Sequence, residues 1–209
     1  MRARDVMNGP VTTVKPDTTV KYAANVLASH GFTALPVVDA DDRLIGIVTE
    51  ADLVRDRFPR DARYRRDDDV VVDPGKTVGE VMTTPAVAMA QTADVVDLIT
   101  VMDNDKIRSI PIVDGSWVVG IVTRRDLVRV LGRDDDDIAA DVRHRLANYA
   151  GPDRWTVHVH DGLVELGDEY DDRSERHVAI VLAEAVPGVV GAHFEPTSVS
   201  RHDHREHQS

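Results

Sequence analysis

Two four-residue clusters in the sequence place a hydroxyl three residues before a carboxylate. They are Thr123–Asp126, which reads Thr-Arg-Arg-Asp, and Thr49–Asp52, which reads Thr-Glu-Ala-Asp. Nucleotide binding requires a carboxylate to accept hydrogen bonds from ribose hydroxyls, together with a hydroxyl, helix N–H groups and cations to hold phosphate. If the Thr123–Asp126 cluster begins a helix, its hydroxyl and carboxylate face the same cleft. The cluster therefore predicts a nucleotide site, while the alternative that Thr123 and Asp126 only cap a helix stays open.

Both clusters belong to an internal repeat. The first copy contains Asp5-Val6-Met7, Leu35–Asp39 and Gly46–Val54, and the second contains Glu80-Val81-Met82, Ile110–Asp114 and Gly120–Val128. The offset is 75 residues up to the Pro-Val/Ile-Val-Asp run and 74 residues after it, because the second copy has a turn one residue shorter. A repeat fixes the unit of folding, and two copies favour a pseudo-symmetric pair over an open array.

Hydrophobic periodicity predicts the elements of each copy. In the first copy we expect a strand over 11–14, a helix from Pro16 to Gly31, a hairpin of strands 34–39 and 44–48, and a short helix from Thr49. The long helix is expected to bury Val20, Ala23, Ala24, Leu27 and Ala28. In the second copy we expect strand 86–88, a helix over about 93–104, strands 109–113 and 117–122, and a helix from about 124. Residues 59–75 read as a charged linker.

The repeat resembles the CBS domain, a small module that binds adenosine ligands and occurs in tandem pairs. Its most specific part is Gly-apolar-x-Thr-x-x-Asp, found at Gly46–Asp52 and again at Gly120–Asp126. The resemblance implies an α+β fold with two β-α-β-β-α units, CBS repeat 1 over 1–58 and CBS repeat 2 over 76–133. It also implies a homodimer formed through the CBS pair.

The same resemblance implies two ligand clefts, in which Asp126 holds ribose, Thr123 and an arginine hold phosphate, and adenine lies against apolar backbone. The ligand-binding residues implied for the second copy are Ala86, Val87, Ala88, Ser109, Ile110, Pro111, Thr123, Arg124, Arg125 and Asp126. Those implied for the first copy are Thr12, Thr13, Ala34, Leu35, Pro36, Thr49 and Asp52. The expected ligand is AMP, ADP or ATP, as a regulatory ligand rather than a required cofactor.

The first copy carries Glu50 and Ala51 where the second carries Arg124 and Arg125. A carboxylate beside a phosphate is repulsive. Three alternatives stay open for the first cleft: an adenosine-like ligand without phosphate, weak binding, or no ligand.

Residues 134–197 form a different segment, with 5 Lys/Arg against 15 Asp/Glu. A helix from Ile138, alternating strands on both sides of Asp161-Gly162, a helix over about 172–186 and a last strand follow in order. Over about 138–195 this segment resembles the BON domain, an α-β-β-α-β family associated with binding phospholipid or other hydrophobic ligands. Asp168 departs from the family pattern, which usually has glycine there. The net charge of −10 predicts repulsion from anionic membranes and nucleic acids.

The four aspartates at 134–137 are expected to cap the first helix of this segment, whose inward face should hold Ile138, Val142, Leu146 and Tyr149. In the second helix, Val178, Val181, Leu182 and Ala185 should point inward. The tail over 198–209 reads as disordered.

Other chemistry finds little support in the sequence. The chain has no cysteine, and no apolar run is long enough to span a bilayer. His158 and His160 share one strand face but have no evident third ligand, so we expect no metal site. No phosphate loop or nucleophile-elbow serine is present, so we expect no enzyme activity.

We therefore expect a cytoplasmic regulatory protein that senses adenine nucleotide in its CBS clefts and signals to a BON interaction domain, which acts through a protein partner or an uncharged ligand. The alternative is a BON-centred binding module, for a protein partner or a hydrophobic ligand, in which the CBS pair is a dimerisation scaffold.

Overall fold

The computed structural model describes residues 1–58, 61, 63, 74–152, 154–168 and 172–195 of the chain. They fall into two compact units, Met1–Arg129 and Val130–Ser209, so the boundary lies within a helix. Most of the predicted linker over 59–75 and all of the predicted tail over 198–209 lie outside the described residues.

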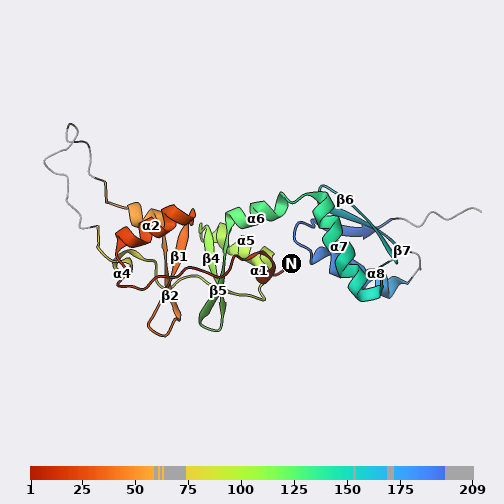
Figure 1. The fold of residues 1–209 in the computed structure, drawn as a ribbon, viewed down its shortest axis with the longest axis horizontal. Coiled ribbons are helices and arrows are strands. Elements are labelled where there is room, and N and C mark those ends of the chain that lie inside the picture. The colour runs from red at the N-terminus through yellow and green to blue at the C-terminus, as the bar shows by residue number, and fades with distance from the viewer. Residues whose placement is uncertain (59–60, 62, 64–73, 153, 169–171, 196–209) are drawn as a thin grey trace, which may run out of the picture. The chain divides into compact units, whose positions relative to one another are not determined.

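The first unit contains both copies of the repeat, and Figure 1 shows their two hairpins side by side. The elements of the first copy are α1 (Ala3–Val6), α2 (Val20–His30), β1 (Ala34–Val38), β2 (Leu44–Thr49) and α3 (Glu50–Val54). Those of the second are α4 (Val78–Val81), β3 (Met89–Ala90), α5 (Val95–Asn104), β4 (Ser109–Asp114), β5 (Trp117–Thr123) and α6 (Arg124–Leu131). Strands β1 and β2 pair antiparallel, as do β4 and β5, and β3 runs parallel to β4.

Helix α2 shows how the local sequence sets these elements. The Thr19 side chain accepts a hydrogen bond from the Tyr22 N–H at its start, and Gly31 ends it with a φ of 66° in the left-handed region, where glycine is least strained. Its buried face consists of Val20, Ala23, Val26 and Leu27, whereas the predicted Ala24 and Ala28 are exposed. The larger Val26 is buried in their place, because the apolar stripe turns slightly around the helix.

The predicted strands over 11–14 and 86–88 are much reduced. The first is a single parallel bridge between Val14 and Val37, and the second is shifted to β3 at Met89–Ala90. The residues just before each of them pair instead with the other copy. Asn8 bridges Ile121 through hydrogen bonds of 2.9 and 3.0 Å, and Thr83 bridges Ile47 through bonds of 2.9 and 3.0 Å.

This exchange, in which the leading segment of each copy pairs with the other copy, explains why a glycine begins each Gly-apolar-x-Thr-x-x-Asp motif. A Cβ on Gly46 would lie 2.8 Å from the Met82 sulfur and 2.9 Å from the Thr83 carbonyl oxygen, and a Cβ on Gly120 would clash with Met7. Each methionine belongs to the leading segment of the other copy. The two repeats are therefore interlocked rather than merely adjacent.

The second unit has the element order α7 (Asp135–Ala150), β6 (Trp155–His160), β7 (Leu163–Asp168), α8 (Arg173–Glu184) and β8 (Gly191–Phe194). Strands β6 and β7 form the hairpin predicted at Asp161-Gly162, and β8 runs parallel to β7. One face of this sheet and the two helices enclose a core whose buried residues include Ile138, Val142, Leu146, Trp155, Val157, Val164, Leu166, Ala179 and Ala183.

Three predictions for this unit are wrong in detail. Asp135 does not cap α7, because its carboxylate accepts the Asp161 and Gly162 N–H groups of the hairpin turn at 2.8 and 3.0 Å. In α8 the inward face is turned by about one residue, since Ala179 and Ala183 are fully buried and Val181 is 51% exposed. Tyr149 of α7 is likewise exposed.

Candidate functional site

The Thr-x-x-Asp pair of each copy has nearly the same geometry. At the start of α6 the Thr123 N–H and hydroxyl donate to Asp126 Oδ2 at 2.8 and 2.6 Å, and the Asp126 N–H donates to Thr123 Oγ1 at 3.4 Å. At the start of α3 the matching distances between Thr49 and Asp52 are 3.0, 2.7 and 3.4 Å. Both pairs therefore cap their helices. Capping uses only Oδ2, so it leaves Oδ1 of each carboxylate for other partners.

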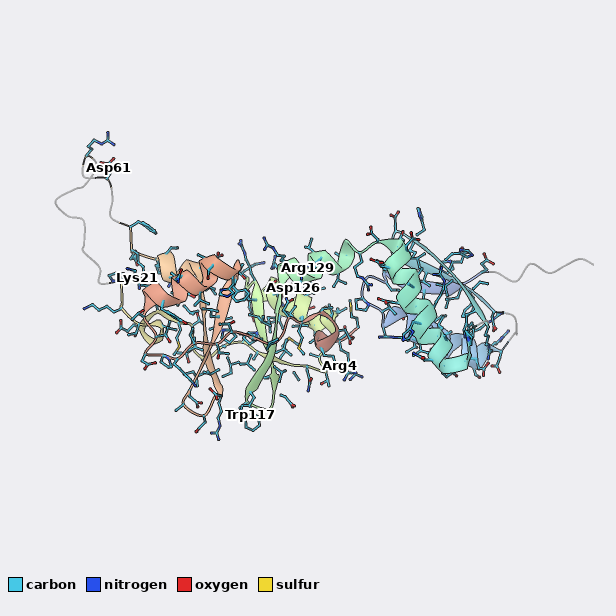
Figure 2. All side chains as sticks on the ribbon, viewed as in Figure 1. Arg4, Lys21, Asp61, Trp117, Asp126 and Arg129 are labelled. Atoms are coloured by element: carbon cyan, nitrogen blue, oxygen red, sulfur yellow. The ribbon has the colours of Figure 1, made fainter. Side chains whose placement is uncertain are left out.

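A cavity of about 440 Å³ lies beside the Asp126 pair. Figure 2 labels Asp126 and Arg129, which both lie on α6. The cavity is lined by Asn8, Pro10, Val11, Thr12, His30, Gly31, Phe32, Thr33, Ala34, Arg108, Ile121, Thr123, Arg124, Arg125, Asp126 and Arg129. Its volume falls within the range of small-molecule sites.

The lining comes from both copies of the repeat. Thr12 and Ala34, which the sequence assigned to the cleft of Asp52, line the cavity of Asp126. The six residues predicted to form its adenine wall, 86–88 and 109–111, are not among the lining residues. The mixed lining arises because the bridge between Asn8 and Ile121 brings the leading segment of the first copy to β5.

Several predicted wall residues have almost no accessible surface. Leu35 is 1% exposed and Ile110 is fully buried, and Pro36 and Pro111 are also buried. These four residues support the cleft as part of the core. Ser109 is buried too, and its hydroxyl lies 3.2 Å from that of Thr33 in the other copy. Thr13 and Val87 are exposed but do not line the cavity.

The cavity is strongly cationic. Four arginines line it, and the only carboxylate among the lining residues is that of Asp126. Asp126 is 4% exposed, and its Oδ1 lies 3.2 Å from a guanidinium nitrogen of Arg129. Such a set of groups can hold a phosphate through the arginines and can accept a hydroxyl hydrogen bond at the carboxylate.

Sequence reasoning missed several lining residues. Arg108 and Arg129 were detectable, since Arg108 immediately precedes β4 and Arg129 stands one helical turn after Asp126. His30 and Phe32 were not, because the sequence assigned this part of the first copy only to a helix end. Their rings stack with centroids 5.1 Å apart at an angle of 19° and add an aromatic wall to the cavity.

The described part of the chain offers little support for a metal site or a membrane span. No group of three or more His, Cys, Asp or Glu side chains is arranged there to hold a metal ion. His158 and His160 are exposed on β6. Among the described helices, none is long and apolar enough to cross a membrane.

Comparison with known proteins identifies the repeats. The model of the CBS domain family matches residues 3–57 and 78–133. Inosine-5'-monophosphate dehydrogenase of Methanocaldococcus jannaschii is 32% identical over 129 residues, which are 61% of this chain but only 23% of that protein. Hypoxic response protein 1 of Mycobacterium tuberculosis is 32% identical over 130 residues, which are 62% of this chain and 84% of that protein.

Two solved structures show similar folds with ligands. The CBS domain pair of protein MJ0100, in complex with 5'-methylthioadenosine and S-adenosyl-L-methionine, has a TM-score of 0.54 and 27% identity and covers 63% of this chain and 96% of its own. The structure of CBSX2 in complex with AMP has a TM-score of 0.52 and 27% identity and covers 61% of this chain and 94% of its own.

Proposed function

Since the chain belongs to the CBS domain family, we propose that its cationic cleft binds an adenine nucleotide (AMP, ADP or ATP) as a regulatory ligand. One observation carries this proposal: the buried Asp126 carboxylate faces a cavity of about 440 Å³ that four arginines line. Two structural neighbours hold adenosine compounds. We propose a regulatory rather than a catalytic role, which the adenosine ligands of these two CBS-pair structures support.

Within this cleft Asp126 accepts the ribose hydroxyls at Oδ1, since Oδ2 is already bound by Thr123. The adenine lies against the residues of the first copy, Val11, Thr12 and Ala34, and the stacked rings of His30 and Phe32. The phosphate lies at the N-terminus of α6, where the helix dipole and the arginines favour negative charge.

The Thr49–Asp52 motif is proposed as a weaker site. By the offset of the repeat, Arg108, Arg124 and Arg125 correspond to Thr33, Glu50 and Ala51. The counterpart of the cationic cleft therefore loses these three arginines and gains Glu50. By the same offset Arg108 and Lys106 take the places of Thr33 and Gly31, and Asp105 takes that of His30, so the counterpart is less cationic. A ligand without phosphate, weak binding and an empty site remain the alternatives for it.

We propose that residues 134–197 are a BON domain that receives the signal and binds a protein partner or an uncharged ligand. The element order from α7 to β8 is consistent with that family. Because the segment has a net charge of −10, the full chain should not co-sediment with phosphatidylglycerol vesicles at about 0.15 M salt. Co-sedimentation would instead support a membrane role.

A second candidate is a CBS pair that serves chiefly as a dimerisation scaffold for the C-terminal unit. Exposed apolar side chains on equivalent helices favour a homodimer, since Val54 of α3 and Val128 of α6 are 53% and 66% exposed. Analytical ultracentrifugation with and without AMP separates the two readings. A dimer that AMP neither stabilises nor alters would favour the scaffold.

Thermal melting of the full chain, stripped of bound nucleotide, tests the proposed function. A ligand that binds only the native state adds about 2.7 kcal/mol at 100 times its Kd, which raises the melting temperature measurably. We expect AMP, ADP or ATP at millimolar concentration to raise it, and guanosine to have no effect. No shift with any adenine nucleotide would contradict the proposal.

A further inference from the structure

The four arginines of the cationic cleft differ in the hydrogen bonds and ion pairs that their guanidinium groups already make. That of Arg124 donates to the Met102 carbonyl oxygen and to Asp103 Oδ1, both at 2.9 Å. That of Arg129 lies 3.2 Å from Asp126 Oδ1. In the part of the chain that the structure describes, the guanidinium groups of Arg108 and Arg125 have neither an ion pair nor a hydrogen bond.

Arg124 has a structural role in this arrangement. Its two bonds tie the first residue of α6 to the C-terminal end of α5, and its charge is neutralised by Asp103. Transferring this side chain to a ligand would break both bonds. The ion pair of Arg129 likewise balances the charge of Asp126.

Arg108 and Arg125 therefore supply the uncompensated charge of the cleft. They come from different elements, the residue before β4 and the second residue of α6. The Arg124 N–H donates to the Arg108 carbonyl oxygen at 3.0 Å, which fixes the backbone of Arg108 beside the start of α6. Both side chains are exposed, so they can approach a ligand without disturbing the core.

Two uncompensated guanidinium groups match the charge of one phosphate monoester, which carries about −1.5 to −2 at neutral pH. We infer that Arg108 and Arg125, and not Arg124, bind the phosphate, so that the cleft selects a nucleoside monophosphate over the uncharged nucleoside. This inference rests on the proposed function and names the two residues that set its specificity. Further phosphates find no additional unpaired arginine among the lining residues, so ADP and ATP gain little over AMP.

Calorimetric titration of the full chain with AMP and with adenosine tests this assignment. We expect Arg108→Ala and Arg125→Ala each to lower AMP affinity about tenfold or more and to leave adenosine affinity unchanged, because each removes charged hydrogen bonds to phosphate only. Arg124→Ala should lower the melting temperature but keep the ratio of AMP to adenosine affinity. Arg43→Ala removes an exposed arginine in the turn before β2 that is not among the lining residues, and it serves as the matched control.

Three outcomes would overturn the inference while leaving the proposed function intact. The first is AMP binding that survives the double variant Arg108→Ala/Arg125→Ala. The second is a loss of AMP selectivity in Arg124→Ala alone, and the third is ATP affinity more than about tenfold above that of AMP. Wild-type protein that binds neither AMP nor adenosine would instead refute the proposed function.

Discussion

The two copies of the repeat have the same capping geometry but differ in the charged side chains around it. The hydroxyl-to-carboxylate distances are 2.6 Å at Thr123 and 2.7 Å at Thr49, and an arginine one turn later pairs with each aspartate, at 3.2 Å for Arg129 and 3.5 Å for Arg55. Three further arginines, Arg108, Arg124 and Arg125, line the cavity beside the Asp126 pair, whereas the first copy has Glu50 and Ala51 at the positions of Arg124 and Arg125. Capping geometry is thus common to both copies, whereas we propose that ligand preference comes from a few exposed positions around it.

The largest difference between the copies should follow removal of the aspartates. Asp126→Ala should cost about 1.5–3 kcal/mol of AMP binding, because charged hydrogen bonds to ribose are lost. Asp52→Ala removes an equivalent cap and should leave most AMP affinity, so it controls for the structural loss. Equal losses measured by calorimetry would mean that the charge difference does not decide where AMP binds.

Because the two copies are interlocked at Gly46 and Gly120, replacing either glycine should lower the free energy of unfolding. Gly46→Ala should lower the free energy of unfolding by about 1–3 kcal/mol, because the new Cβ meets the Thr83 carbonyl oxygen at 2.9 Å. Gly120→Ala should cost less, since its new contacts are with the flexible Met7 side chain.

Gly191→Ala in β8 is the control for these variants, because its Cβ would make an ordinary contact of 3.5 Å with Leu163. Chemical denaturation compares the three variants. A Gly46→Ala variant as stable as the control would argue against the exchanged pairing.

Substitutions can also reduce the charge difference between the two copies. The double variant Glu50→Arg/Ala51→Arg gives the first copy two of the three arginines that distinguish the second. We expect AMP affinity at this copy to rise about tenfold, as charged contacts of about 1.4 kcal/mol replace repulsion. Titration in an Asp126→Ala background isolates the effect. No gain would show that the first copy lacks a usable cavity.

Salt should affect the two kinds of ligand differently, and this is the smallest effect. AMP affinity should fall severalfold between about 0.05 and 0.5 M NaCl, because exposed charges are screened. Adenosine affinity should hardly change. Equal salt dependence of the two ligands, measured by titration at both concentrations, would weaken the assignment of a phosphate site.

The sequence predicted what is local to one stretch of chain. The left-handed end of α2 at Gly31, the hairpin at Asp161-Gly162 and the order of strands and helices follow from side-chain period and turn chemistry. The sequence assigned each cleft to one copy, whereas the cavity beside Asp126 is lined by both, because the pairing of Asn8 with Ile121 joins segments more than a hundred residues apart. No pattern within one copy contains that information. The face of α8 was missed because alanines at 179 and 183 are a weaker signal than Val181.

Calorimetric titration of AMP into nucleotide-free full chain is the most direct test of the central claim, which is that one cationic cleft recognises an adenine nucleotide. We predict a single AMP site per chain that Asp126→Ala weakens and Asp52→Ala preserves. Two equal sites per chain, or no binding at all, would contradict it.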